Sequence, residues 1–220
     1  MRSLKLLRKP LAAAILLAVA GASQAAISVF TTQASFLAAV TAPGVDTFAD
    51  LSVTTATASP LNRTAGSYTY RAATPDSFFG AGSAANPWLS TNTAADSITF
   101  SNFAAGVSAI GGFFVGSDVN GAFTSGSLTL LATDGVGATS TQTIAGGVTS
   151  FLGFVSTTSM TSLVLSAVQP AGGFLWPAAD NLTLAISPVA VPVPEPETYA
   201  LFLSGLGLLG IFGRRRRLPS

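Results

Sequence analysis

The chain has 220 residues, no cysteine, no histidine and a formal net charge of +1. These absences exclude disulfides, thiol catalysis, a Ser-His-Asp triad and cysteine or histidine metal ligands. From residue 26 to 187, two arginines and seven aspartates give a charge of −5 without any lysine, which excludes lysine Schiff bases and the basic clusters that bind nucleic acid.

The first 25 residues have the three parts of a secretory signal peptide. Basic residues lie among the first nine, an apolar run extends over Leu11–Ala20, and small residues follow. We expect export by the Sec machinery and cleavage between Ala25 and Ala26. The alternative is an uncleaved N-terminal anchor, for which the apolar run is short.

Residues 26–187 predict one all-β domain, in which short strands are separated by Gly, Asp and Asn turns. The predicted strands cover residues 27–30, 67–71, 96–103, 107–116, 127–132, 138–144, 150–155, 161–168 and 181–186. Residues 31–40 predict a short helix that is capped by Thr32, with Phe36, Leu37 and Val40 facing inward. The pair Gly111-Gly112 indicates a bulge or a close backbone approach. We expect an antiparallel, two-sheet β-sandwich of jelly-roll type.

Two tryptophans are candidates for sugar binding. Trp88 and Trp176 each lie beside a proline in a loop-like context, and an exposed indole stacks on a pyranose face. The alternative is that both rings close the ends of the sandwich core.

A structural calcium is the candidate metal. Asp118 and Asn120 precede a glycine at alternate positions, and Asp180 could supply a further oxygen near the last strand. The distal glutamate of an EF-hand is missing, and the alternative is two solvated turns. We expect no other cofactor.

Catalysis has few candidates in this body. Two aspartates could hydrolyse a glycoside, but sequence spacing does not show which of the seven approach each other. Most of them lie beside Gly, Asn or Pro, where aspartate commonly caps a turn. We therefore expect a protein that is not an enzyme.

The C-terminal residues form a Pro-rich linker (188–198) and then an apolar segment with a basic end (199–220). The apolar stretch from Tyr199 to Phe212 spans about two-thirds of a hydrocarbon core about 30 Å thick. Arg214, Arg215, Arg216 and Arg217 form a cytoplasmic stop. We expect a transmembrane helix that holds the chain only transiently.

Pro194, Glu195 and Pro196, the apolar segment and the terminal arginines together resemble the PEP-CTERM sorting signal of Gram-negative bacteria. The resemblance implies recognition at Pro194-Glu195-Pro196 by an exosortase, which cleaves nearby, and retention by the arginines. The second half of the body also resembles a domain that is common ahead of such tails, through residues 113–118, 127–135, 150–156 and 180–184.

The expected function is that of an exported cell-surface or extracellular-matrix protein, associated with exopolysaccharide or biofilm. A carbohydrate-binding module that uses its tryptophans is the second hypothesis, and a hydrolase built on aspartates is the third.

Overall fold

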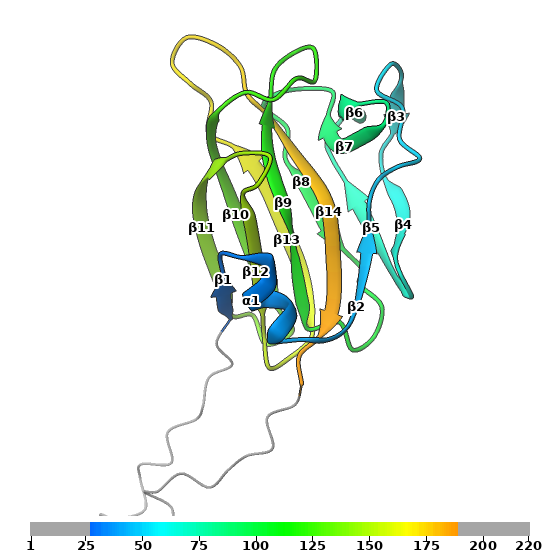
Figure 1. Cartoon of the computed structure of the whole chain (residues 1–220), viewed down its shortest axis with the longest axis vertical. Helices are drawn as coiled ribbons and strands as arrows, with labels where there is room; N and C mark the ends of the chain where they lie inside the picture. The colour runs from blue at the N-terminus through cyan, green and yellow to red at the C-terminus, as the bar shows by residue number, and fades with distance from the viewer. Residues whose placement is uncertain (1–26, 189–220) are drawn as a thin grey trace, which may run out of the picture.

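Residues 27–188 are described by a computed structural model, which contains one helix and fourteen strands in two sheets (Figure 1). The larger sheet comprises β1 (Ser28–Phe30), β2 (Thr41–Asp46), β3 (Ala56–Ala58), β6 (Ser77–Ser83), β7 (Asn86–Thr91), β9 (Ala109–Ser117), β12 (Phe151–Val155) and β14 (Trp176–Ile186). The smaller sheet comprises β4 (Leu61–Ala65), β5 (Tyr68–Ala73), β8 (Ile98–Ser101), β10 (Gly126–Asp134), β11 (Thr139–Gly146) and β13 (Met160–Ala167).

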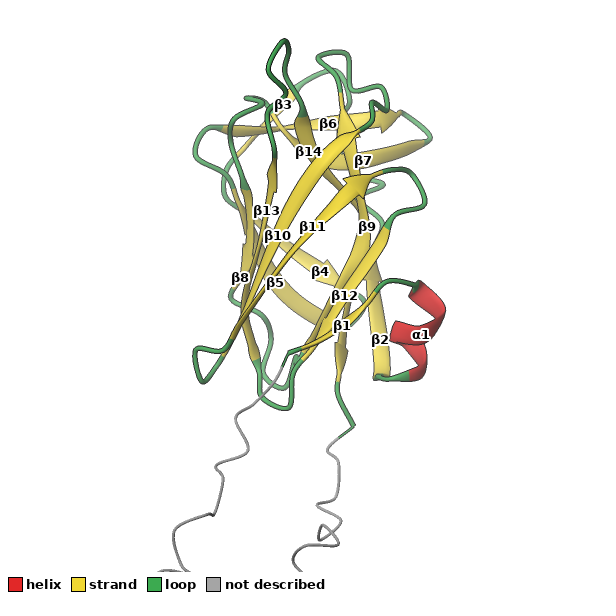
Figure 2. Ribbon diagram, turned by 90° about the vertical axis from the view of Figure 1, so that its left-hand side faces the viewer, coloured by secondary structure: helices red, strands yellow, loops and turns green. Residues whose placement is uncertain are grey.

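Every strand pairing is antiparallel. The larger sheet has the order β1-β12-β9-β14-β7-β6-β3, and β2 pairs with the end of β14. The smaller sheet has the order β11-β10-β13-β8-β5-β4. Figure 2 shows the strands of both sheets running obliquely across a layered body, with α1 at one side. The prediction of an all-β, antiparallel, sandwich-like body is confirmed.

Both sheets contribute side chains to one large core. Phe114 and Phe154 of the larger sheet and Phe100, Leu130 and Leu165 of the smaller sheet belong to the same cluster and are fully buried. The alternation that predicted β8, β10 and β13 therefore corresponds to one face of the smaller sheet packing on the larger sheet. Burial of this apolar area is the main source of stability in a domain without disulfides.

The helix α1 (Gln33–Ala38) forms where it was predicted. The side chain of Thr32 accepts a hydrogen bond of 3.2 Å from the backbone N–H of Ser35, which caps the first turn. Phe36 is fully buried, and Val40 is buried with it against the outer face of the larger sheet. Leu37 is 39% exposed, so the prediction that it faces inward is wrong.

The Gly111-Gly112 pair lies where the backbones of neighbouring strands come close. A Cβ atom at Gly111 would lie 2.8 Å from the Phe151 ring. The bulge itself is on the partner strand: Asp180 pairs with Phe113 but Thr183 pairs with Gly111, so β14 has one residue more. Asn181 within this bulge has a φ of 50°. Both parts of the prediction are found, and the extra residue belongs to β14.

The strands between residues 41 and 91 were predicted least well. Only β5 was expected there, whereas the structure adds β2, β3, β4, β6 and β7. Prolines and glycines interrupt the alternation in β2, β6 and β7, and β3 has only three residues. Strand β14 also begins five residues before the predicted start at Asn181, because Asp180-Asn181 forms a bulge within the strand and not the turn before it.

Candidate functional site

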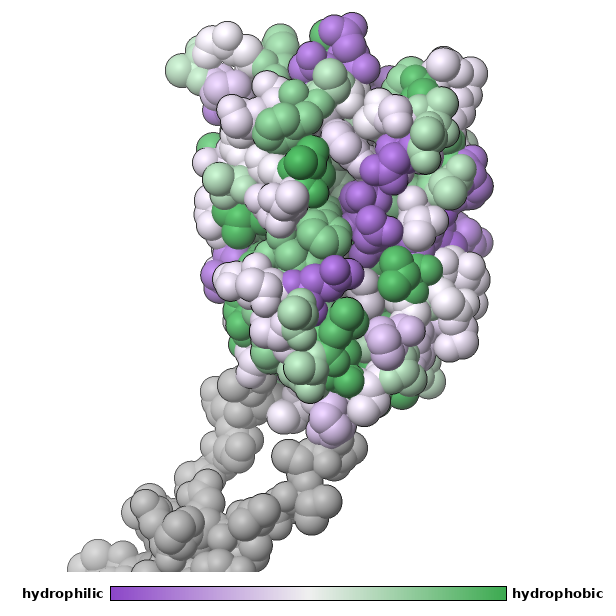
Figure 3. Space-filling view, viewed as in Figure 1, coloured by the Kyte–Doolittle hydropathy of each residue, from purple (hydrophilic) through white to green (hydrophobic). Residues whose placement is uncertain are grey.

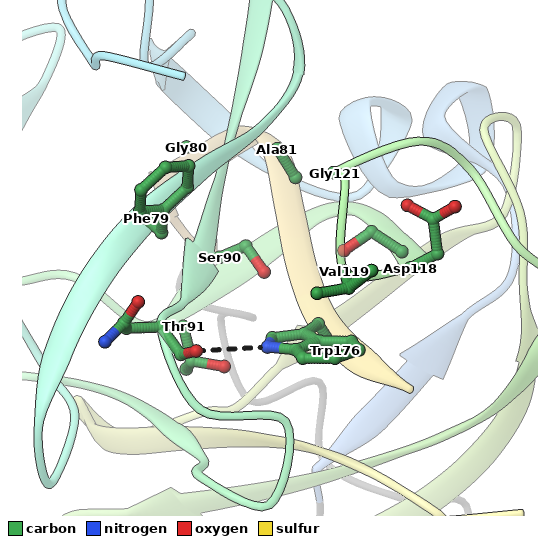
Figure 4. Close-up of a pocket in the computed structure, with 11 residues that line it drawn as sticks. Phe79, Gly80, Ala81, Ser90, Thr91, Asp118, Val119, Gly121 and Trp176 are labelled. Carbon is green, nitrogen blue, oxygen red and sulfur yellow. Dashed lines mark hydrogen bonds between the residues drawn. The ribbon is translucent and has the colours of Figure 1, made fainter. Parts of the chain in front are cut away.

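An open pocket of about 140 Å³ lies where β6, β7, β9 and β14 meet (Figure 4). The end of β9 and the start of β14, which contribute to its lining, lie at the end of the body opposite to the one where the described residues begin and end (Figure 1). The lining residues come from β6 and β7, from the end of β9 and the turn after it, and from the start of β14. They are Phe79, Gly80, Ala81, Ser90, Thr91, Asn92, Ser117, Asp118, Val119, Gly121 and Trp176.

Trp176 forms one wall of this pocket, as Figure 4 shows. Its indole N–H donates a hydrogen bond of 3.3 Å to the backbone carbonyl of Asn92, which fixes the half-buried ring. Phe174 lies edge-on to Trp176, with ring centroids 6.1 Å apart, and is 73% exposed. Trp176 is thus the aromatic wall of the pocket, and Phe174 extends the apolar surface beside it.

The serine hydroxyls of the pocket differ in whether they have a hydrogen-bond partner. The Ser90 hydroxyl donates a 2.9 Å hydrogen bond to the carbonyl of Pro177. Ser117 is only 1% exposed, and its Oγ has no hydrogen-bond partner within the described residues. A buried hydroxyl without a partner costs free energy. The pocket lining thus includes a hydrogen-bonding group that the described residues leave unused.

Asp118 serves the turn that borders the pocket. Its Oδ1 accepts hydrogen bonds of 2.9 Å from the backbone N–H groups of Asn120 and Ala122. Figure 4 shows the carboxylate pointing away from Trp176. The turn-capping alternative of the sequence therefore describes Asp118.

The predicted calcium ligands are not brought together. Asp180 pairs with Phe113 on β9. Phe113 precedes Asp118 by five residues, so Asp180 and Asp118 are separated by about 16 Å along the strand direction, at about 3.3 Å per residue. Between residues 27 and 188, no group of three or more acidic residues is placed to hold a metal ion. Asp118, Asn120 and Asp180 thus do not form one site.

Trp88 is 8% exposed and packs with Ala81, Val115 and Ala178 on the outer face of the larger sheet. Its ring faces are covered, so the prediction of an exposed stacking ring at Trp88 is wrong. Of the two candidate tryptophans, Trp176 alone lines the pocket.

Three residues at or beside the pocket were not predicted from the sequence: Phe174, Ser117 and Ser90. The glycines before Phe174 were a signal that its side chain lies in a loop, next to the tryptophan already chosen. Ser117 and Ser90 lie within strands, and nothing in their sequence neighbourhood separates them from the other serines. They meet because β14 lies between β7 and β9.

A second polar cluster joins β2, β4 and β5 around Arg63. The guanidinium holds Asp46 through Nε (2.6 Å) and Nη2 (2.9 Å), and it also contacts Asp50 at 2.7 Å. The Tyr70 hydroxyl donates to Asp46 at 2.7 Å, and the guanidinium lies 5.0 Å above the centre of the Phe48 ring. We call these five residues the Arg63 cluster.

Charges in the Arg63 cluster support each other. Hydrogen bonds from Arg63 lower the pKa of Asp50, against the opposing effect of partial burial. Burial would lower the pKa of Arg63, but its hydrogen bonds to Asp46 and Asp50 raise it. Burial and the neighbouring Asp46 raise the pKa of Tyr70. These shifts keep the ion pair charged and the phenol neutral, as in a structural network.

Two further aspartates are buried, and their pKa values shift in opposite directions. Burial would raise the pKa of Asp134, but hydrogen bonds from the Ser156 hydroxyl and two turn amides outweigh it and lower the pKa. Burial raises the pKa of Asp180, which is 8% exposed and whose Oδ1 lacks a partner within the described residues. Asp46, Asp50, Asp118 and Asp134 therefore all have identifiable structural partners.

The predicted terminal elements lie outside the described residues. These are the signal peptide with its cleavage point at Ala25 and Ala26, the linker beyond residue 188, and the apolar segment with its arginines. In residues 27–188, the six-residue α1 is the one helix, and it is too short to cross a membrane.

A protein with an all-β body and a C-terminal sorting tail is the class that these features define. The family model of the PEP-CTERM protein-sorting motif matches residues 192–217. This match includes Pro194, Glu195, Pro196 and the four arginines, so the predicted resemblance of the tail to the PEP-CTERM sorting signal is confirmed. Neither a curated protein nor a solved structure matches the chain. The motif indicates an exported protein and implies processing by an exosortase.

Proposed function

We propose that this protein is a non-enzymatic component of the cell surface or extracellular matrix of a Gram-negative bacterium, associated with exopolysaccharide or biofilm. The Sec machinery exports it, the C-terminal segment holds it in the inner membrane for a short time, and an exosortase releases it near Pro194-Glu195-Pro196. The match of the sorting motif to residues 192–217 carries this proposal. The roles of four aspartates in turns and in the Arg63 cluster support a body without catalytic carboxylates.

The body supports this role as a jelly-roll-type sandwich. Strands β7, β14, β9 and β12 are neighbours in one sheet, and β8, β13, β10 and β11 are neighbours in the other. The chain crosses between the sheets at every step from β7 to β14 except at the β10–β11 hairpin. Jelly-roll sandwiches form viral capsid and lectin domains, so a body of this type suits a display module.

The test is the intact mass of the protein released by cells with and without the exosortase. We expect loss of the C-terminal segment only in cells that have the enzyme. Replacing Pro194, Glu195 and Pro196 by alanine should give unprocessed protein, whereas the control Pro188→Ala, outside the matched residues, should be processed normally. Equal masses in both strains would refute sorting by this route.

A second candidate function is carbohydrate binding at the pocket beside Trp176. It is favoured by the half-buried Trp176, which lines the pocket and contacts the exposed Phe174, and by the buried, unpartnered hydroxyl of Ser117 in the same lining. Asp118 is the one charged residue among those that line the pocket, and it points away. The pocket therefore suits a neutral sugar that places a pyranose face against Trp176.

Glycan-array screening followed by calorimetry tests this function. Trp176→Ala and Phe174→Ala should each weaken binding by about tenfold, which is about 1.4 kcal/mol, without lowering the melting temperature much. The control is Val136→Ala, an exposed residue (66%) in the β10–β11 turn. Binding that survives both aromatic substitutions would exclude this pocket as the sugar site.

A further inference from the structure

The sheet edges of the body are protected to different degrees. In the larger sheet, β1 and β3 have three residues each, and β2 contains Pro43 and Asp46. In the smaller sheet, β4 has five residues and carries Arg63. Short length, proline and charge are the usual means by which an edge strand avoids pairing with another chain. Strand β11 is the exception.

Strand β11 has eight residues, TSTQTIAG, without charge or proline. Its pairing with β10 runs without a register shift from Gly126 opposite Gly146 to Thr133 opposite Thr139. Within residues 27–188, no strand pairs with its other side. Figure 1 places β11 at one flank of the molecule, with β3 and β4 at the other. It therefore presents a long, regular row of backbone donors and acceptors.

The side chains of β11 suit a second β11 strand. Thr139, Thr141 and Thr143 are exposed and face the same side of the sheet. The existing β10–β11 pairing already places Thr129 opposite Thr143, with their hydroxyl oxygens 3.3 Å apart. An antiparallel pair of β11 strands centred on Thr141 would place Thr139 opposite Thr143 twice. Such cross-strand threonine pairs stabilise sheets.

The distribution of charge also favours β11 as the place where two copies of the chain meet. The body carries −5, so two copies repel each other over most orientations. The Arg63 cluster, with two of the aspartates, lies on β2, β4, β5 and the segment after β2. The aspartate nearest to β11 in sequence, Asp134, is 2% exposed and hydrogen-bonded within its turn. Two copies therefore meet with little repulsion at β11.

We propose that β11 is a homotypic interaction surface, at which it pairs antiparallel with β11 of a second copy of this chain. The pairing is isologous, so that the same residues contact each other on both sides of a two-fold axis. It joins the two six-stranded sheets edge to edge. This surface shares no residue with the Trp176 pocket or with the sorting motif, and it does not depend on the function proposed for either.

The test is the molar mass of the exported, mature protein in sedimentation or light scattering across a concentration series. The native protein should form a dimer. Thr141→Lys places two ammonium groups opposite each other and should weaken the dimer by at least about tenfold. Thr64→Lys on β4, an exposed threonine at the other edge of the same sheet, is the matched control and should leave the dimer intact.

A pair of variants with opposite charges at Thr141 makes the test specific to pairing between two β11 strands. Mixing Thr141→Lys with Thr141→Asp should restore a dimer that neither variant forms alone. Circular dichroism confirms that the variants are folded, and hydrogen exchange of the native protein provides a readout without substitution: β11 amides should gain protection as concentration rises. A native protein that stays monomeric at about 100 μM would overturn the proposal, because a dimer of that affinity is weaker than a typical specific interface. Loss of the dimer in Thr64→Lys but not in Thr141→Lys would overturn it as well.

Discussion

The Arg63 cluster and the Trp176 pocket are two polar regions of one body, and they differ in how completely their polar groups are paired. In the cluster, Arg63 holds Asp46 through two nitrogens, and Tyr70 donates to the same carboxylate. In the pocket, the Ser117 Oγ is buried without a partner, and Phe174 is 73% exposed. A fully paired buried network stabilises a fold, whereas unpaired polar groups beside exposed rings leave room for a ligand.

The largest expected effect is in the Arg63 cluster. Arg63→Ala leaves the buried Asp46 carboxylate without its counter-ion and should lower the free energy of unfolding by about 3–5 kcal/mol. Urea denaturation measures the change. The control is Arg71→Ala, which removes the same charge from the outer face of β5 and should change stability by no more than about 0.5 kcal/mol. Equal effects of the two substitutions would mean that the cluster is not a structural network.

Two serines with equal burial sharpen the comparison. Ser156 and Ser117 are each 1% exposed, but only the Ser156 hydroxyl has a partner, the Asp134 carboxylate at 2.8 Å. Ser156→Ala should cost about 1–3 kcal/mol because it leaves a buried carboxylate oxygen unpaired. Ser117→Ala removes a buried hydroxyl without a partner and should leave stability unchanged or raise it slightly. A destabilising Ser117→Ala would show that this hydroxyl is paired in solution and would weaken the case for the pocket.

The smallest expected effect is a difference in pH dependence between two buried aspartates. The raised pKa of Asp180 favours its protonated form in the folded state, so its contribution to stability is lost as pH rises from about 4 through that raised pKa. Asp180→Asn should therefore match the native protein in acid and exceed its stability near pH 7. Thermal unfolding at a series of pH values from about 3 to about 7 measures the difference in stability between the variant and the native protein.

The substitution Asp134→Asn should change the pH dependence of stability in the opposite direction. The lowered pKa of Asp134 stabilises the native protein above the ordinary value of 3.8, and this contribution is lost as pH falls through the lowered pKa. The variant should be less stable than the native protein near pH 7 and approach it in acid. Parallel pH profiles for the two variants would contradict the environments that the structure gives to Asp134 and Asp180.

The prediction from sequence succeeded where a segment carries its own local signal. Thr32 caps α1 through an interaction within one turn, and strands β8, β10 and β13 alternate because one face of each is buried. The sorting motif is likewise a continuous stretch, so its match at residues 192–217 could be anticipated without the fold. In each case, neighbours in the chain provide the information.

The prediction failed where the partner is distant in the chain. Strand β7 contains Pro87 and has little alternation, and it forms because β6 and β14 pair with it. Trp88 and Trp176 have similar sequence surroundings, but packing with Ala81, Val115 and Ala178 covers the first, while the second lines a pocket.

The amino-acid sequence by itself determined that this is an all-β body with a sorting tail, because strand alternation and a linear motif depend on residues adjacent in the chain. Only the tertiary structure decided which tryptophan is accessible, which aspartates are paired and which sheet edge stays open. Those properties depend on strands such as β7 and β14, which are far apart in sequence and meet only through long-range pairing.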